Sequence, residues 1–284
     1  MRELNYKIPK RFRLKAMGVY IAAGVVVFIS IFPFIWMLST SIKPPSEIFT
    51  LTPRLLPHHT TLENYIGVFK GTMFGRYFLN SIIIAASTTV LGLSIAILGA
   101  YSLARFEYPG RHSFLLLILI VQMFPIVVLI IPLFVVMRQF HLLNTHYCLI
   151  IAYITFILPL CVWMLKGFFE SIPKELEEAA MIDGCSRVGA FLKIALPLSV
   201  PGIAATSIFS FIGAWNEFMF ALTFINTEAL KTIPVGLQSF IGRFVVEWGQ
   251  VMAASVMFTL PSLVFFMIVQ KHLTKGLFAG SVKG

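Results

Sequence analysis

Six stretches of this chain are uncharged, or almost uncharged, over a length that crosses a bilayer. They cover residues 17–38, 77–104, 113–137, 147–165, 198–225 and 249–270, and Glu217 is the one charged residue inside them. A transmembrane helix needs about 20 predominantly apolar residues. The first run is longer than the apolar region of a cleavable signal peptide, which has about 7–15 residues. The sequence therefore predicts an all-α membrane protein with six transmembrane helices.

The composition and the placement of charge agree with this layout. Only 12% of the residues are charged, against about 25% in a typical soluble domain. Of the 22 Lys and Arg residues, 15 fall in the two terminal segments and the loops after the second and fourth spans, and 7 fall on the other side. Membrane proteins keep basic residues on the cytoplasmic side. Both termini are therefore predicted to be cytoplasmic, and the net charge of +10 needs no nucleic-acid partner.

Prolines and small residues mark where the predicted helices bend and pack. Each proline removes a backbone donor, so bends are expected at Pro33, Pro125, Pro132, Pro159, Pro201 and Pro261. Gly92, Ala96 and Ala100 recur every four residues, a spacing that lets two membrane helices approach closely.

Neither the cysteines nor the paired histidines indicate a metal or redox site. Cys148, Cys161 and Cys185 form no close-spaced pair, so we interpret them as packing residues. His58 and His59 are adjacent in a loop, and no cluster of cysteines or carboxylates accompanies them. No metal site is predicted.

The loop between the fourth and fifth spans, residues 166–197, holds five of the 12 acidic residues. Ser171 is expected to cap a helix, with Pro173 in its first turn and Gly184 ending it in a left-handed conformation. A second helical pattern covers residues 187–194. The first helix carries the acidic residues Glu175, Glu177, Glu178 and Asp183, and an apolar stripe of Leu176, Ala179 and Ala180.

This amphipathic, acidic segment needs a surface for its apolar face. Anionic lipid would repel it, whereas surface-lying membrane helices are usually rich in Lys and Arg. A cytoplasmic protein with a basic groove is the better match. The alternative is an ordinary solvated loop helix.

The same loop carries a motif that identifies a family. Glu178-Ala179-Ala180, then Gly184 after three residues, then residues 194–197 (IALP) after nine more, match the EAA-x3-G-x9-I-x-LP signature of ABC importer permeases. The resemblance covers nearly the whole chain and is strongest to the carbohydrate-uptake branch, of the maltose-transporter second-permease type. It also includes Asn80-Ser81, residues 100–105 (AYSLAR), Trp215-Asn216-Glu217 and residues 279–284.

The resemblance implies a type I ABC importer permease fold. Residues 1–16 would be a cytoplasmic tail, 17–270 the permease domain with the coupling loop 166–197, and 271–284 a second cytoplasmic tail. The loop would dock in a cleft of the ATP-binding subunit. The residues to which the resemblance gives this coupling role are Glu178, Ala179, Ala180, Asp183, Gly184, Leu196 and Pro197, while Cys185 replaces an expected small residue.

The chain lacks the means to use ATP itself. A phosphate-binding P-loop needs a Gly-Lys step, and the sequence contains none. No catalytic residue and no cofactor are predicted for this chain, and ATP and Mg²⁺ are expected on partner ATPase subunits. The expected partners are a dimer of those subunits, a second homologous permease, an extracytoplasmic substrate-binding protein and membrane lipid.

Polar side chains inside a membrane span are costly, so they are candidates for lining the translocation path. Glu217 with Trp215 and Asn216 suits a sugar, whose ring stacks on aromatic groups and whose hydroxyls need partners. Asn80, Gln122 and Tyr153 are weaker candidates. The alternative is that these groups join helices or face a water-filled opening.

The predicted function is therefore that of a permease subunit of an ATP-driven sugar importer in a bacterial inner membrane. Disaccharide, oligosaccharide, glycerol phosphoester and polyol substrates all stay open. An ion-coupled secondary transporter is the alternative, but it usually needs several buried ionisable residues. A membrane-embedded enzyme would need a catalytic constellation that is not visible.

Overall fold

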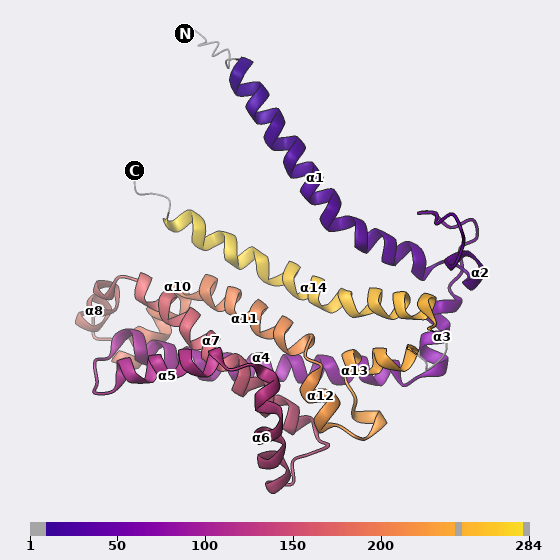
Figure 1. Cartoon of the computed structure of the whole chain (residues 1–284). Coiled ribbons are helices and arrows are strands. Elements are labelled where there is room, and N and C mark those ends of the chain that lie inside the picture. The colour runs from indigo at the N-terminus through magenta and orange to yellow at the C-terminus, as the bar shows by residue number, and fades with distance from the viewer. Residues whose placement is uncertain (1–9, 242–245, 281–284) are drawn as a thin grey trace. The chain divides into compact units, whose positions relative to one another are not determined.

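The computed structural model describes residues 10–241 and 246–280, and the side chains from 17 to 273 within these ranges except that of Ser239. This part of the chain is almost entirely helical and forms no β-strand (Figure 1). The chain divides into two compact units. One contains residues up to 68 together with 240–256, and the other contains 69–239 together with residues from 257 onward.

Four uninterrupted helices are long and apolar enough to cross a membrane. They are α1 (Lys10–Ser41), α4 (Phe74–Arg105), α7 (His146–Ser171) and α14 (Trp248–Gly280). Two bent pairs raise the number of spans in the described residues to six if each pair is one span. The all-α prediction is confirmed. Helices α1 and α14 extend into the predicted tails, of which residues 1–9 and 281–284 lie outside the described part.

The predicted span 113–137 is a bent pair of helices, and the bend expected at Pro125 is confirmed. α5 (Arg111–Met123) and α6 (Ile126–Gln139) are bent by 103°, and α6 runs steeply away from α5 in Figure 1. Phe124 has an extended ψ of 130°, as expected for a residue before proline. Pro125 therefore breaks the span, whereas Pro132 lies inside α6.

The fifth predicted span is also broken at both ends. Residues Arg187–Leu198 and α11 (Val200–Trp215) meet at 70°. α11 ends at Trp215, and a short helix, α12 (Met219–Phe224), follows after three residues. The almost uncharged run 198–225 thus has a bend at its start and a break in its second half.

The core of the second unit is formed by α4, α7 and α11, which run side by side (Figure 1). Gly92, Ala96 and Ala100 are buried on α4, and a Cβ at Gly92 would lie 3.8 Å from Ile154 of α7. A Cβ at Gly202 would lie only 2.3 Å from the Phe168 ring. Small residues therefore set the spacing of these helices.

Short elements connect the long helices of the second unit. They are α8 (Lys174–Ile182), α9 (Arg187–Ala190), a π-helical turn (Phe191–Ala195), α10 (Leu196–Leu198), a 3-10 turn (Glu228–Leu230), α13 (Ile233–Leu237) and a 3-10 turn (Gln238–Phe240) that ends where the first unit resumes.

Side-chain hydrogen bonds fix the connection between α12 and α13. Asn144 Oδ1 accepts from the backbone N–H groups of Asn226 and Thr227, at 3.0 and 2.8 Å. Ser81 Oγ accepts from the Ile233 N–H at 2.8 Å. The loop 225–233 is therefore held by α4 and by the loop before α7.

In the first unit, the chain after α1 is held by buried polar groups. α2 (Pro45–Ile48) and α3 (Glu63–Gly71) follow α1. Asn64 of α3 donates from Nδ2 to the carbonyl oxygens of Ser41 and Lys43, at 2.9 and 2.8 Å. A Cβ at Gly249 would lie 2.3 Å from Asn64 Oδ1. Glycine thus permits the start of α14 to approach this amide.

Candidate coupling site

The predicted coupling segment is a helix, a turn and a second helix. Ser171 does not cap the first helix, since it ends α7 and donates from Oγ to the Phe168 carbonyl at 2.7 Å. Ile172, before Pro173, is extended with a ψ of 124°, so α8 begins only at Lys174. Gly184 has a φ of +91°, which confirms its left-handed conformation.

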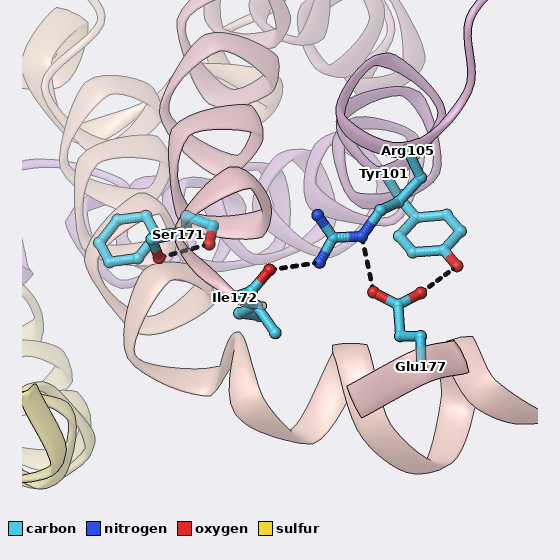
Figure 2. Close-up of polar contacts among 6 residues, drawn as sticks. Tyr101, Arg105, Ser171, Ile172 and Glu177 are labelled. Carbon is cyan, nitrogen blue, oxygen red and sulfur yellow. Dashed lines mark hydrogen bonds and ion pairs between the residues drawn. The ribbon is translucent and has the colours of Figure 1, made fainter. Parts of the chain in front are cut away.

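Glu177 points inward from α8 and is held by the end of α4. Its Oε1 lies 2.6 Å from Arg105 Nε, and its Oε2 accepts from the Tyr101 hydroxyl at 2.6 Å. Arg105 Nη2 also donates to the Ile172 carbonyl at 3.0 Å. Figure 2 shows Tyr101 and Arg105 converging on the Glu177 carboxylate. We call Tyr101, Arg105, Ile172 and Glu177 the Glu177 clasp.

The clasp is shielded from water. The side chains of Arg105 and Glu177 are 8% and 7% exposed. Desolvation offsets much of the attraction in a buried ion pair, so such a pair specifies position more than it adds stability. Its effect here is to fix α8 against the carboxyl end of α4.

Tyr101 joins the clasp to an aromatic cluster. Its ring centroid lies 4.5 Å from that of Phe191 in the π-helical turn and 5.5 Å from that of Phe169 in α7. The Phe106 ring lies edge-on to Tyr101, with centroids 6.0 Å apart. One side chain thus contacts α7, α8 and the turn that leads to α11. Tyr101 therefore links α8 to α7 and to the π-helical turn.

The motif residues are exposed or partly exposed, and Glu178 lines the same cavity as Tyr101, Arg105 and Glu177. Glu178, Ala179, Asp183, Gly184 and Pro197 are exposed, and Ala180 and Leu196 are partly exposed. Apolar side chains lie among them: Leu176 is 45% exposed and Ile182 86%. Of the predicted apolar stripe, Leu176 and Ala179 are thus exposed in the described part of the chain, and Ala180 is partly exposed.

Sequence reasoning missed Glu177 as a site residue. It assigned a role to Glu178, through the family motif, and none to Glu177. The available signal was Arg105, the last residue of the quoted 100–105 match, because a basic residue at the end of an apolar span is a candidate partner for a loop carboxylate. Nothing in the local pattern selected Glu177 over Glu178.

Trp215 lies in an aromatic core rather than on an open surface. It is 1% exposed, and its Nε1 donates to the Phe258 carbonyl at 3.1 Å. Its ring stacks on that of Phe258, with centroids 5.4 Å apart and 15° between the planes. These contacts support the packing alternative for this residue.

Glu217 caps the short helix that follows it. Its carboxylate accepts from the backbone N–H groups of Phe220 and Ala221, at 2.8 and 3.2 Å. The buried Tyr153 hydroxyl faces the same carboxyl group without a hydrogen bond of good geometry. Asn216 is exposed beside them. Tyr153, Asn216 and Glu217 therefore lie together at the break between α11 and α12.

The other predicted path residues have different surroundings. Asn80 Nδ2 donates to the carbonyl oxygens of Ala229 and Lys231, both at 2.9 Å. Gln122 lines a cavity of about 150 Å³ between α5 and α7, beside Pro159 and Trp163. Asn80 thus anchors a loop, and Gln122 lies in mainly apolar surroundings.

Metal-ligating side chains do not gather in the described residues. No group of three or more His, Cys, Asp or Glu side chains occurs there. The three cysteines are free; Cys148 and Cys161 are buried and Cys185 is partly exposed.

The bent-helix fold and the exposed motif define the membrane component of a binding-protein-dependent transport system. Residues 88–279 match the family model described as "Binding-protein-dependent transport system inner membrane component". The match covers more than half of the chain, and the chain belongs to this family. It is thus an inner-membrane permease of the ABC importer class.

Relatives agree with this assignment. A sulfoquinovosyl glycerol transport system permease protein of Agrobacterium fabrum is 42% identical over 93% of both chains. A trehalose/maltose transport system permease protein of Thermococcus litoralis is 40% identical, over 95% of this chain and 98% of its own. An inner membrane ABC transporter permease protein of Escherichia coli is 36% identical over the same shares.

A solved structure shows the same fold. It is a bacterial ABC transporter involved in the import of the acidic polysaccharide alginate, with a TM-score of 0.79 at 24% identity over 93% of this chain and 98% of that chain. A second alginate transporter structure, in complex with an alginate pentasaccharide-bound periplasmic protein, has a TM-score of 0.67 at 16% identity, over 92% and 93%.

Proposed function

We propose that this chain is one of two permease subunits of an ATP-driven sugar importer. It forms half of the translocation path and transmits closure of the ATPase subunits through α8. The observation that carries the proposal is the two-sided character of α8: Glu178 and its motif neighbours face outward, while Glu177 ties the helix to α4. Relatives named for the transport of sulfoquinovosyl glycerol, diacetylchitobiose, trehalose and maltose support a sugar substrate.

The exposed side chains of α8 and its motif define what their partner must offer. Carboxylates at Glu178 and Asp183 require basic groups, and the exposed Ile182 requires an apolar recess. The small side chains of Ala179 and Ala180 permit close approach. A cleft of an ATP-binding subunit meets these needs, and movement of that cleft would displace α8, Glu177 and the end of α4 together.

The remaining subunits follow from the same assignment. The distribution of basic residues supports cytoplasmic termini and a cytoplasmic α8, with the segments 39–75 and 226–248 outside. ATP and Mg²⁺ would bind to a pair of ATPase subunits, and this chain would be non-catalytic. Substrate would arrive on an extracytoplasmic binding protein. Residues 17–270 would form the permease domain, and residues 1–16 and 271–284 its cytoplasmic ends.

We propose that the sugar path passes the break between α11 and α12. Asn216 is open there, and Glu217 and Tyr153 lie beside it. The side chains of Trp215 and Asn80 are already hydrogen-bonded within this chain. We therefore propose that they, together with Gln122, shape the path without binding the sugar directly.

Gly184→Asp and Ala180→Arg test the coupling role. Both changes add a larger, charged side chain to the exposed motif. Uptake and retention of the ATPase subunits in solubilised complexes are therefore expected to fall, while membrane insertion stays intact. Gly110→Asp is the matched control for Gly184→Asp, because Gly110 is exposed, has a similar φ of +87°, and a Cβ there meets no atom within 4 Å. Undiminished uptake and retention in both variants would refute the proposal.

A simpler measurement distinguishes the ATP-driven importer from an ion-coupled secondary transporter. Such a protein works as a single chain. Uptake in vesicles that contain this chain but no ATPase subunit would favour it over the importer.

A further inference from the structure

A cavity of about 220 Å³ lies in the first unit, at the end of α1 and the start of α14. Trp36, Lys43, Arg54 and Trp248 are among its lining residues. Trp36 lies near the end of the apolar run 17–38, and Trp248 directly precedes the run 249–270. In an inner-membrane protein, tryptophans at such positions mark the boundary between membrane and water. The cavity is therefore interfacial.

Lys43 is a buried cation on this cavity without a carboxylate partner. The residue is 4% exposed. Its Nζ donates to the Arg54 carbonyl at 2.6 Å and lies 5.0 Å from the centroid of the Trp36 ring. Among the described residues, none of the ion pairs within 4.0 Å involves Lys43. A buried ammonium group is costly unless a negative charge compensates it.

Glu47 lines the same cavity, but its carboxylate is used elsewhere. Its two oxygens accept from the backbone N–H groups of His58 and His59, at 2.8 and 3.1 Å. These hydrogen bonds, that of His58 first, hold the pKa of Glu47 below its usual value. Glu47 therefore stays ionised and holds the loop at residues 58–59. The cavity lining contains two basic residues, Lys43 and Arg54, and one carboxylate, Glu47, so its net charge is +1.

The rest of the site is shaped for a molecule with a polar end and an apolar end. A second cavity of about 190 Å³ shares Lys43, Glu47 and Arg54 with the first and adds Thr50 and Thr52. On the other side, the walls include the apolar residues Ile48, Phe49 and Met252.

The helix that carries Trp36 also offers an apolar surface along the membrane. No residue is buried in the most apolar 18-residue window of α1, and Phe28, Ile29 and Phe32 are all exposed. Hydrocarbon chains bound along this surface would continue directly from the cavity. A freely soluble anion would use only the polar end.

We propose that this cavity binds the headgroup of an anionic phospholipid, with its phosphate beside Lys43 and Arg54 and its acyl chains along α1. The tryptophans Trp36 and Trp248 flank the headgroup at the interface. The lipid supplies the negative charge that Lys43 lacks, and it connects the ends of α1 and α14 within this unit.

Native mass spectrometry of the delipidated full-length protein tests the site. Phosphatidylglycerol is expected to bind more tightly than phosphatidylcholine, and the preference should fall about fivefold for each cation removed in Lys43→Gln and Arg54→Gln. Lys70→Gln is the matched control, because Lys70 is exposed and lines neither cavity. Since Lys43 also holds a backbone carbonyl, Trp248→Ala provides a second variant if Lys43→Gln does not fold.

Three results would overturn the proposal. One is equal binding of the two lipids. Another is a preference that survives in both Arg54→Gln and Trp248→Ala. The third is protection against thermal unfolding by inorganic phosphate or by a free sugar that equals protection by phosphatidylglycerol, which would assign the cavity to a soluble ligand.

Discussion

The coupling segment and the break after Trp215 each contain one partly or fully shielded carboxylate, and the partners of the two differ. Glu177 binds side chains 72 and 76 residues away on α4. Within the described residues, the hydrogen bonds of good geometry to Glu217 come from backbone N–H groups three and four residues further along the chain. The contacts of Glu177 join α8 to α4, whereas those of Glu217 cap the start of the short helix α12. A displacement of α8 must therefore involve α4, whereas α12 can shift without breaking a distant ion pair.

The largest expected effect comes from removing one partner of the clasp. Arg105→Met leaves Glu177 buried and uncompensated, which is expected to destabilise the fold by about 3–5 kcal/mol. A lower thermal unfolding temperature of the solubilised protein measures it. The double variant Arg105→Met with Glu177→Leu should recover most of the stability without recovering uptake. If the single variant unfolds at the wild-type temperature, the clasp does not hold α8.

A smaller effect is expected at the residue that connects the clasp to the aromatic cluster. Tyr101→Phe keeps the ring against Phe191 but removes the hydroxyl that donates to Glu177, a loss of about 1.5–3 kcal/mol for a hydrogen bond to a charged group. The readout is uptake per ATP hydrolysed in the reconstituted complex, which should fall more than the unfolding temperature alone explains. Tyr108→Phe, on an exposed tyrosine, is the control and should change neither quantity.

The local carboxylate should matter less for stability. Glu217→Gln weakens the cap on α12, and the loss of a helix cap costs about 0.5–2 kcal/mol. Thermal unfolding should therefore change less than in Arg105→Met. Asn216→Ala tests the path separately, because Asn216 is exposed and its side chain caps no helix. If the break between α11 and α12 lines the path, both Asn216→Ala and Glu217→Gln should raise the KM for uptake. Equal destabilisation by Glu217→Gln and Arg105→Met would remove the contrast between the two regions.

The smallest effect is expected in the loop 225–233, where an exposed carboxylate links the loop to α4. Hydrogen bonds from Lys231 and then Tyr77 hold the pKa of Glu228 below its usual value. The stabilisation is therefore present above the ordinary glutamate pKa of about 4.3 and is lost as the pH falls through the lower value in the folded state. Unfolding temperatures of wild type and Glu228→Gln should differ slightly at pH 7 and converge below pH ~4. A difference that persists there would show that the carboxylate charge is not the cause.

Much of the fold was predictable because its signals are local. A run of about 20 uncharged residues predicts a membrane helix from composition alone, and the helices α1, α4, α7 and α14 cover the corresponding runs. Gly184 has the left-handed conformation expected at a helix end. The exact start of α8 was missed because Ser171 and Pro173 both resemble start signals, and the extended Ile172 before proline separates them.

The break in the third span shows where local signals stop being sufficient. Pro125 and Pro132 both lie in the same apolar run, yet only Pro125 separates two helices. A proline inside a helix is tolerated when neighbouring groups satisfy the freed carbonyl. Whether such neighbours exist depends on packing and not on the residues beside the proline.

By itself, the sequence determined that this chain is a helical membrane protein with the acidic, small-residue EAA motif of ABC importer permeases in one loop. It did so because charge is costly in a bilayer and because the motif is continuous in the chain. Only the tertiary structure decided which of the adjacent residues Glu177 and Glu178 is buried. The helix turns by 100° per residue, so neighbours face different directions, and the face that meets Tyr101 and Arg105 is set by the packing of α8 on α4.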